Sequence, residues 1–243
     1  PAQAYEAAKM FGWFQRMLAD LPQPKLHETI PDFHNTPKRL KDFMEILDRD
    51  SHNRAGHAKD EISFIFEHAD IADQLLKLVQ KGIIPERITH NDTKINNVLF
   101  DTVTDKGICV IDFDTVMPGL SLYDFGDMVR TATCQAAEDE QNLSKIQLDI
   151  DFFEKIARGY AHETDEFLTD TEKENLVMAG KLITYEQMVR FLGDYFNGDT
   201  YYKIHRPEHN LDRARTQMKL VQSILAQEDK MNEITKTVWE ELT

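Results

Sequence analysis

The spacing of apolar residues predicts a chain that is helical at both ends and β-rich in the middle. Between Ala4 and Leu21 apolar residues recur every three or four positions, which predicts an amphipathic helix that stops at Pro22 and Pro24. A stretch interrupted by further prolines follows, and a short helix is expected from residue 39 to 47.

A change of period marks the middle of the chain. Helical spacing runs from residue 60 to 81 and ends at Gly82. Short runs rich in Val, Ile and Phe follow, each bounded by turn residues, which is typical of strands at 87–90, 97–101 and 108–113. Helical periodicity then returns, and the expected helices cover 152–160, 172–192 and 211–225.

These elements predict an α+β fold that is predominantly α, with a small antiparallel hairpin among helices. The sequence shows no internal repeat and no linker long enough to divide it, so residues 1–243 are expected to form a single domain. A chain of 243 residues is long enough to bury a core of ordinary size.

The charge of the chain argues against nucleic acid as a general partner. Lys and Arg number 28 against 43 Asp and Glu, so the formal net charge is −15. Such a surface repels phosphate backbones and anionic lipid. No apolar run approaches the roughly 18 residues of a membrane span, and the start lacks the pattern of a secretory leader, so no membrane association is expected.

The two cysteines, Cys109 and Cys134, indicate a reducing compartment. The run around Cys109 predicts a buried strand, so a disulfide framework is not expected and a cytoplasmic location is. The chain opens at Pro1 without Met and enters helical periodicity at once, which suggests a piece of a longer protein.

The most informative segment is the expected hairpin. If 97–101 and 108–112 are its arms and 102–107 is its loop, Asn97 directly faces Asp112 at one end. Directly opposed side chains have Cβ atoms about 5 Å apart. Two oxygen ligands at that separation can share one Mg²⁺.

Asp92 supplies another polar group near this pair. It lies on the loop that enters the same end of the hairpin, shortly before Asn97. Phosphoryl transfer needs an acidic group to orient the attacking hydroxyl, and an Asn and an Asp to hold Mg²⁺ against the phosphates of ATP. Lys94 adds a positive charge that offsets charge developing on the transferred group. Each residue alone is typical of turns and caps, but together they favour phosphoryl transfer.

The same residues resemble a known family. They are similar to the motifs of the aminoglycoside phosphotransferase superfamily, small-molecule kinases with a protein-kinase-like fold, in His90-x-Asp92-x-x-x-x-Asn97, Ile111-Asp112 and Tyr123-Asp124-Phe125-Gly126-Asp127. The chain resembles most closely the N-acetylhexosamine 1-kinases, which phosphorylate the anomeric hydroxyl of GlcNAc or GalNAc. That resemblance is carried by LHETIPDFHNTPKR at 26–39, HNDTKINNVLFD at 90–101, VIDFDTVMPG at 110–119 and GDTYYKIHRPEHNLDRARTQMKLV at 198–221.

The resemblance implies a role for each matching position. Asp92 would be the catalytic base, and Asn97 and Asp112 the magnesium ligands. His90 would support the catalytic loop rather than shuttle protons. Asp124 would hold that loop by accepting hydrogen bonds from its backbone.

Three further residues complete the candidate set. In extended chain Asp114 points to the same face as Asp112 and could touch a second metal, or it could equally be a solvated strand end. Arg190 and Tyr201 fall where the resemblance implies contacts with the sugar. An aromatic ring covers the apolar side of a pyranose, and a guanidinium group binds hydroxyl or acetamido oxygens. Basic residues outnumber acidic ones from 181 to 220, which suits a place near phosphates.

One part of a kinase is missing from the sequence. A kinase of this fold has an N-terminal lobe with a glycine-containing phosphate loop and a strand Lys that grips the nucleotide. The ten glycines form neither GxGxxG nor GxxxxGK, and the region before Asp92 predicts helices. The chain therefore resembles the C-terminal lobe alone, and we expect this polypeptide by itself to transfer little or no phosphate.

Other chemistries fit less well. His205 and His209 could be zinc ligands, but Pro207 breaks the helix that would bring them to one face, and HExxH is absent. A metallophosphatase ligand loop is also absent, and residues 101–107 lack the ligands of a calcium loop. Two alternatives stay open: a non-catalytic kinase-like module that binds a sugar or a protein, and a kinase for another small alcohol such as an aminoglycoside or a choline-like substrate.

Overall fold

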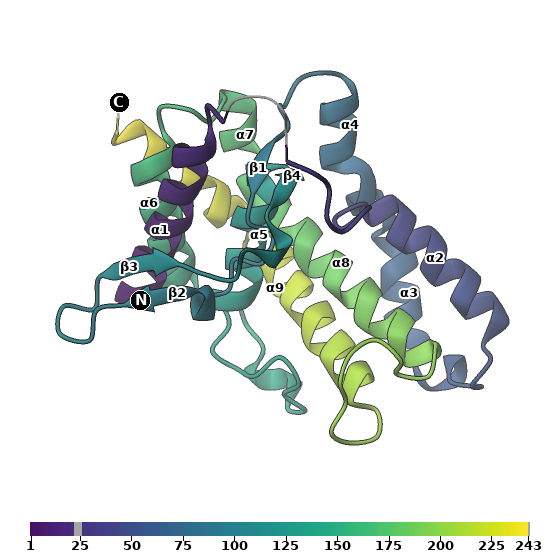
Figure 1. Ribbon diagram of the computed structural model, residues 1–243. Coiled ribbons are helices and arrows are strands. Elements are labelled where there is room, and N and C mark those ends of the chain that lie inside the picture. Colours follow the sequence, from purple (N-terminus) through teal and green to yellow (C-terminus); the bar gives the residue numbers. More distant parts are fainter. Residues whose placement is uncertain (22–25, 243) are drawn as a thin grey trace.

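A computed structural model describes residues 1–21 and 26–242 (Figure 1). The first helix, α1, covers Ala2–Leu18 and ends before the expected stop at Pro22 and Pro24, which lies outside the described residues. The other helices are α2 Thr36–Arg49, α3 Lys59–Glu67, α4 Gln74–Gln80, α5 Ser121–Ala132, α6 Ile150–Thr164, α7 Asp170–Glu174, α8 Leu176–Phe196 and α9 His209–Glu240.

Two small antiparallel sheets accompany these helices. In the first, β1 (Arg87–Thr89) pairs with β4 (Met117–Gly119), and in the second, β2 (Val98–Phe100) pairs with β3 (Gly107–Val110). The architecture is α+β and predominantly α, as the sequence predicted. Sequence periodicity did not single out β4, which ends at Gly119, or α5, which begins at Ser121.

Helix α8 is the centre of the molecule. It packs against α2, α5 and α9 (Figure 1), and all of its 21 residues are buried except Met178 and Arg190. A helix that is apolar on every side is stable only when other elements cover all its faces. Arg190 is therefore one of the two residues of α8 that are not buried.

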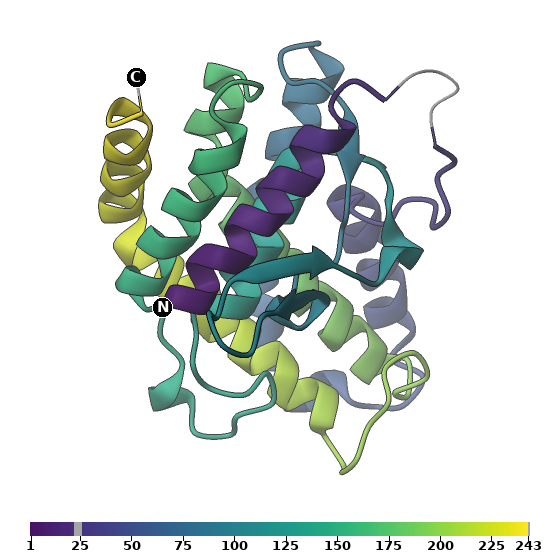
Figure 2. The same ribbon diagram turned by 60° about the vertical axis from the view of Figure 1, so that its left-hand side comes forward.

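Helix α1 connects the helices to the β2–β3 hairpin. It lies along α6, and a glycine makes the contact possible, since a Cβ atom on Gly159 would lie 2.2 Å from the carbonyl oxygen of Tyr5. Figure 2 shows β3 crossing the opposite side of α1. The hairpin is thus held against a helix instead of a larger sheet.

The register of the hairpin differs from the expected one. Val98 pairs with Val110 and Leu99 with Cys109, and the peptide N–H of Ile111 donates to the carbonyl oxygen of Asn97 at 2.9 Å. Asn97 therefore opposes Ile111, and the prediction that it directly faces Asp112 was wrong.

The loop of the hairpin explains the shifted register. A bulge follows Leu99, so the loop covers 101–106 instead of 102–107. The carboxylate of Asp101 accepts hydrogen bonds from the backbone N–H groups of Val103 and Thr104, which lower its pKa. An Asp side chain that bonds the backbone two residues on builds a tight turn, and this turn uses Asp101 as its first residue.

Two other expectations need correction. The helix expected from 60 to 81 is interrupted, because a 3₁₀ segment, Ala69–Asp73, separates α3 from α4. Cys109 was expected in a buried strand but is exposed, as is its neighbour Ile108, because the two-stranded β2–β3 sheet is not covered along this part of β3. Both cysteines are free.

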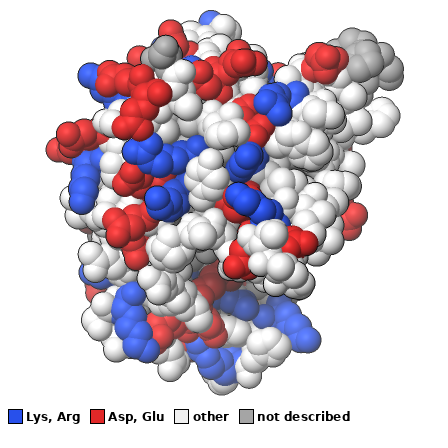
Figure 3. Space-filling model, turned by 90° about the vertical axis from the view of Figure 1, so that its left-hand side faces the viewer, with Lys and Arg blue, Asp and Glu red and all other residues white. Residues whose placement is uncertain are grey.

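The described surface carries mixed charge. Figure 3 shows acidic and basic side chains alternating over the described residues of the face that includes α1, α6 and the hairpin. No helix within residues 1–21 and 26–242 is both long and apolar enough to cross a membrane.

The start of α7 provides a test of the fold. Glu172 completes a capping box with Thr169 and binds the guanidinium of Arg87 on β1 through both carboxylate oxygens, at 2.8 and 2.7 Å. Glu172→Ala removes the cap and leaves Arg87 unpaired where its side chain is 15% exposed, so we expect a loss of about 2–4 kcal/mol in the free energy of unfolding. Urea unfolding measures this loss, and Glu174→Ala, at an exposed position on the same helix, is the matched control.

Candidate functional site

The loop between β1 and β2 carries the candidate base, Asp92. The side-chain Nδ2 of Asn97 donates to the backbone oxygen of Asp92 at 2.8 Å and to its Oδ2 at 3.1 Å. The Nζ of Lys94 lies 2.8 Å from the Oδ1 of Asp92. The Asp92 side chain is 24% exposed, so its carboxylate is held by two neighbours while solvent still reaches it.

Asp124, at the start of α5, binds the backbone of this loop. Its two carboxylate oxygens accept the backbone N–H groups of His90 at 2.9 Å and Asn91 at 2.7 Å. Gln15 on α1 donates a third hydrogen bond at 2.6 Å, and Tyr160 on α6 orients the Gln15 amide. Complete burial raises the pKa of Asp124, although the nearby His90 and these hydrogen bonds oppose the rise.

The rest of the Tyr-Asp-Phe-Gly-Asp motif also helps to position the loop that carries Asp92. Asp127, one turn after Asp124, accepts the backbone N–H of Thr93 at 2.9 Å, while the Thr93 hydroxyl donates to the Asp124 carbonyl oxygen at 2.7 Å. The motif glycine allows close helix packing, since a Cβ on Gly126 would lie 2.5 Å from the carbonyl oxygen of Ala179 on α8. α5 therefore packs closely against α8, and two of its carboxylates accept hydrogen bonds from the loop that carries Asp92.

His90 is buried and has no access to a reacting group. Its Nε2 donates to the carbonyl oxygen of Ile111 at 2.9 Å, and its ring packs edge-on against Phe11, Phe14 and Phe113. The ring thus ties the loop of Asp92 to the residue directly before Asp112.

Asp112 and Asp114 lie just beyond β3. Asp112 has a left-handed backbone conformation, with φ of 68°, and Asp114 is in a short 3₁₀ turn at 113–115. Both are exposed. Because the backbone of Ile111 pairs with that of Asn97, Asp112 lies at the same end of the hairpin as Asn97. A left-handed residue interrupts strand alternation, so the argument that placed Asp112 and Asp114 on one face does not apply.

These residues have the chemistry that Mg²⁺ requires. Both hydrogen bonds from the Asn97 side chain use Nδ2, so its Oδ1 is the atom suited to a metal. Mg²⁺ is commonly held by one or two carboxylates together with substrate phosphates and water. Among the described residues no group of three or more His, Cys, Asp and Glu side chains could hold a metal alone.

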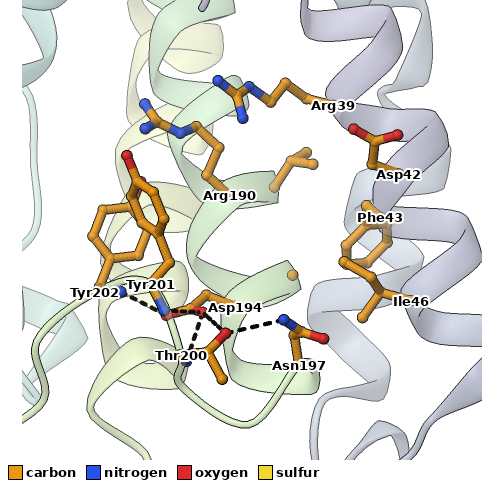
Figure 4. A pocket seen from close by; sticks show the side chains of 12 residues that line it. Arg39, Asp42, Phe43, Ile46, Arg190, Asp194, Asn197, Thr200, Tyr201 and Tyr202 are labelled. Atoms are coloured by element: carbon orange, nitrogen blue, oxygen red, sulfur yellow. Dashed lines mark hydrogen bonds between the residues drawn. The ribbon is translucent and has the colours of Figure 1, made fainter. Parts of the chain in front are cut away.

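Arg190 and Tyr201 line one pocket of about 340 Å³, between α2, α8 and the loop after α8 (Figure 4). The Arg190 guanidinium lies over the rings of Phe33 and Tyr202, 5.4 and 5.7 Å from their centroids, and donates to Gln187. Tyr201 is 73% exposed.

The loop that presents Tyr201 is organised by Asp194, which the sequence analysis missed. Its buried carboxylate accepts the backbone N–H groups of Thr200, Tyr201 and Tyr202, as Figure 4 shows, and the side chain of Asn210. The spacing of residues in the sequence does not show that an acid near a helix end is buried among backbone donors, so Asp194 could not be recognised from the sequence.

The opposite wall of the pocket comes from α2, and the residues just before α2 are bound to α8. Glu186 on α8 accepts hydrogen bonds from His34 at 2.9 Å and Thr36 at 2.7 Å. Burial alone would raise the pKa of Glu186, but these partners and Arg190 lower it overall. Arg39 also lines the pocket, with a buried Nε that has no hydrogen-bond partner. Its guanidinium and that of Arg190 both lie along the upper side of the pocket in Figure 4.

The Tyr202 hydroxyl, which belongs to a residue of this pocket, has Gln187 as hydrogen-bond donor and two basic residues nearby. Tyr202 accepts a hydrogen bond from Gln187 at 3.1 Å, and both Arg190 and Arg130 lower its pKa against the larger effect of burial. Arg130 is paired with Asp127, which holds Thr93 beside Asp92.

Comparison with known proteins identifies the fold. The fold is that of small-molecule kinases: it is similar to a choline kinase from Cryptosporidium parvum Iowa II, with 15% sequence identity and a TM-score of 0.52 over 97% of this chain and 68% of that one. An ADP-bound aminoglycoside phosphotransferase matches with 16% identity and a TM-score of 0.44 over 91% of this chain. The chain spans 65% of the length of that phosphotransferase.

The family itself is defined by sequence. The model of the phosphotransferase enzyme family matches residues 1–161, which include α1, the catalytic loop and the hairpin. The chain belongs to this family.

The contacts of Asp124 generate a prediction. In Asp124→Asn an amide N–H₂ replaces one of the two oxygens that accept the His90 and Asn91 N–H groups, which leaves a buried donor unsatisfied at a cost of about 1–3 kcal/mol. We expect faster hydrogen exchange at both amides and a lower unfolding midpoint. Asp105→Asn is the control, because Asp105 is exposed and its φ of 55° suits Asn. Equal exchange in the two variants would remove Asp124 as the anchor of the loop.

Proposed function

We propose that this chain is the catalytic and acceptor-binding lobe of a small-molecule kinase that transfers the γ-phosphoryl group of ATP to a sugar hydroxyl. The observation that carries the proposal is the Asp92 carboxylate, held by Asn97 and Lys94 on a loop whose backbone is bound to two buried acids. Phosphoryl transfer depends mainly on positioning and electrostatic stabilisation, and this loop supplies a fixed acid beside a cation.

Each polar residue of the loop has a distinct task in this reaction. Asp92 orients the attacking hydroxyl and accepts its proton as the bond to phosphorus forms. Lys94 lies beside Asp92 and neutralises charge on the transferred group, for which it exchanges its carboxylate partner for phosphate oxygens. Asn97 positions Asp92 through the hydrogen bonds that its Nδ2 donates, and its Oδ1 would bind a metal ion.

Asn97 and Asp112 are the residues that would hold Mg²⁺, with Asp114 as a candidate for a second ion. Bound Mg²⁺ neutralises the phosphates of ATP. The oxygen ligands would come from one end of a short hairpin, where His90 couples the two loops that carry Asn97 and Asp112.

An N-acetylhexosamine, GlcNAc or GalNAc, is the acceptor that we propose, with the anomeric hydroxyl directed to Asp92. Support comes from the pocket of Arg190 and Tyr201, which combines aromatic rings with guanidinium donors. Rings of this kind cover the apolar face of a pyranose, and guanidinium groups bind acetamido or hydroxyl oxygens.

The nucleotide needs a second lobe in this proposal. Leu99, Ile108 and Phe113 are exposed on the hairpin and just after it, by 49, 59 and 55%. An apolar group of this kind suits an N-terminal lobe that closes over ATP. We therefore propose that the chain alone transfers little phosphate. A kinase-like module that binds sugar without turnover is the second candidate, favoured only if a protein with both lobes is inactive.

Replacement of Asp92 tests the catalytic assignment. In a protein that also carries the N-terminal lobe, Asp92→Asn keeps the size of the side chain but cannot accept the proton, so we expect kcat to fall at least about 100-fold while sugar affinity stays nearly unchanged. Steady-state ADP release and calorimetry with GlcNAc measure the two effects, and Asp105→Asn serves as the control. Unchanged turnover in Asp92→Asn would refute the base.

The acceptor pocket is tested separately with the chain itself. Arg190→Ala removes the guanidinium that lies between Phe33 and Tyr202, and a loss of about 1.4 kcal/mol corresponds to tenfold weaker binding of GlcNAc. Calorimetry gives the affinity, with Arg49→Ala at an exposed position of α2 as the control. Equal affinities of Arg190→Ala and the original chain would exclude this pocket as the sugar site.

A further inference from the structure

Two guanidinium groups line the pocket of Tyr201. They belong to Arg39 on α2 and Arg190 on α8. Within residues 1–21 and 26–242, every other arginine except Arg49 has a carboxylate oxygen within 4.0 Å. The formal net charge of the chain is −15, so acidic side chains are plentiful elsewhere. Guanidinium groups that face a pocket without such a partner are suited to bind an anion from solution.

The two groups lie close together, because both contact Phe33. The Nη2 of Arg39 donates to the carbonyl oxygen of Phe33 at 3.1 Å, and the Arg190 guanidinium lies 5.4 Å from the centroid of the Phe33 ring. Figure 4 shows both guanidinium groups along the upper side of the pocket. Neighbouring cations repel each other, and an anion that binds between them is attracted by both.

Both guanidinium groups keep hydrogen-bond donors for a ligand. A guanidinium has several N–H donors, of which Arg39 uses one on Phe33 and Arg190 uses one on Gln187. The Nε of Arg39 is buried without a hydrogen-bond partner among the described residues, so this cation has lost part of its hydration. Because charges removed from water are screened less, such a cation binds an anion more strongly than one on the open surface.

The two acids that line the pocket do not neutralise these cations. Asp42 pairs with Lys38 at 2.8 Å, where both side chains are about half exposed. The carboxylate of Asp194 lies at the opposite end of the pocket from the guanidinium groups in Figure 4. There it accepts backbone N–H groups of the loop after α8.

A buried acid balances part of the charge of Arg190. Burial would raise the pKa of Glu186, but His34 and Arg190 lower it overall, so Glu186 is an anion in the interior near Arg190. Arg39 instead donates to a backbone carbonyl oxygen, which is neutral. Arg39 is therefore the cation whose charge this pocket balances least.

We propose that the preferred acceptor is an N-acetylhexosamine that carries an oxyanion, as a carboxylate or a phosphate group, and that Arg39 and Arg190 bind this oxyanion together. The inference rests on the proposed function, because it takes the pocket of Arg190 and Tyr201 as the acceptor site. The acetamido oxygen of neutral GlcNAc satisfies guanidinium donors but not their charge. An acidic substituent supplies both lone pairs and charge, so Arg39 selects for an acidic acceptor.

The first test is calorimetry with the chain. GlcNAc is compared with two acidic probes, N-acetylmuramic acid and GlcNAc 6-phosphate, and with the neutral methyl ester of N-acetylmuramic acid. We expect at least one acidic probe to bind about tenfold more tightly than GlcNAc, and the ester to bind no more tightly than GlcNAc. The probe that gains affinity identifies the oxyanion as carboxylate or phosphate.

The outcomes separate this inference from the proposed function. If GlcNAc binds and neither acidic probe binds more tightly, the preference for an oxyanion is wrong and the proposed function is untouched. If none of the sugars binds, the pocket is not an acceptor site and both are wrong.

Variants of Arg39 test whether this residue selects for charge. Arg39→Gln should lower the affinity for the acidic probe about tenfold and the affinity for GlcNAc much less, because only the acidic probe loses a charged partner. Arg39→Lys keeps the charge and should retain most of the preference. Arg49→Gln removes the same charge from an exposed position of α2 and is the matched control. An unchanged preference in Arg39→Gln, or an equal loss in Arg49→Gln, would overturn the assignment.

Salt dependence and stability exclude a merely structural Arg39. Raising the salt concentration from about 0.05 M to about 0.5 M should weaken the acidic probe several-fold and leave GlcNAc unchanged, because ions screen charge attraction. Arg39 also holds the backbone of Phe33. If Arg39→Gln lowered the unfolding temperature by several degrees and weakened both sugars equally, Arg39 would serve the fold and the inference would be refuted.

Discussion

The structure depends on one buried carboxylate. Asp124 accepts hydrogen bonds from two consecutive backbone N–H groups of the loop that carries Asp92 and from one side chain of α1. Asp127, one helical turn later, accepts a backbone N–H of the same loop. A buried acid is expensive unless its lone pairs are used. Here the lone pairs of Asp124 accept hydrogen bonds from the backbone of the loop that carries Asp92. The buried carboxylate therefore fixes the position of Asp92.

The sequence predicted the residue types of the site better than their geometry. The spacing from Asp92 to Asn97 pointed to the loop, and the family resemblance implied that Asp124 accepts hydrogen bonds from its backbone, as it does in the structure. The register failed, because the bulge after Leu99 and the turn at Asp101 shift the arms by one residue. A shift of one residue is decided by turn hydrogen bonds that no periodicity records.

The pocket of Arg190 and Tyr201 shows the same difference between residue types and geometry. Arg190 and Tyr201 were identified by resemblance, and they do line one pocket. Asp194, which shapes the loop of Tyr201, and Arg39, on a helix far away in sequence, were not found. Their importance arises from burial and from contacts between distant segments, as with Glu186, which joins α8 to His34 and Thr36. Composition and spacing carry no information on such contacts.

The enclosure of α8 has a consequence for how this architecture can diversify. Nearly every side chain of that helix is committed to the interior, and Arg190 is one of two that are not. Mutational change is therefore tolerated least along α8, the helix that supplies part of the lining of the pocket of Arg190 and Tyr201. The side chains of α2 and of the segment after α8 are freer to change, so the pocket of Arg190 and Tyr201 can be reshaped while the interior stays constant.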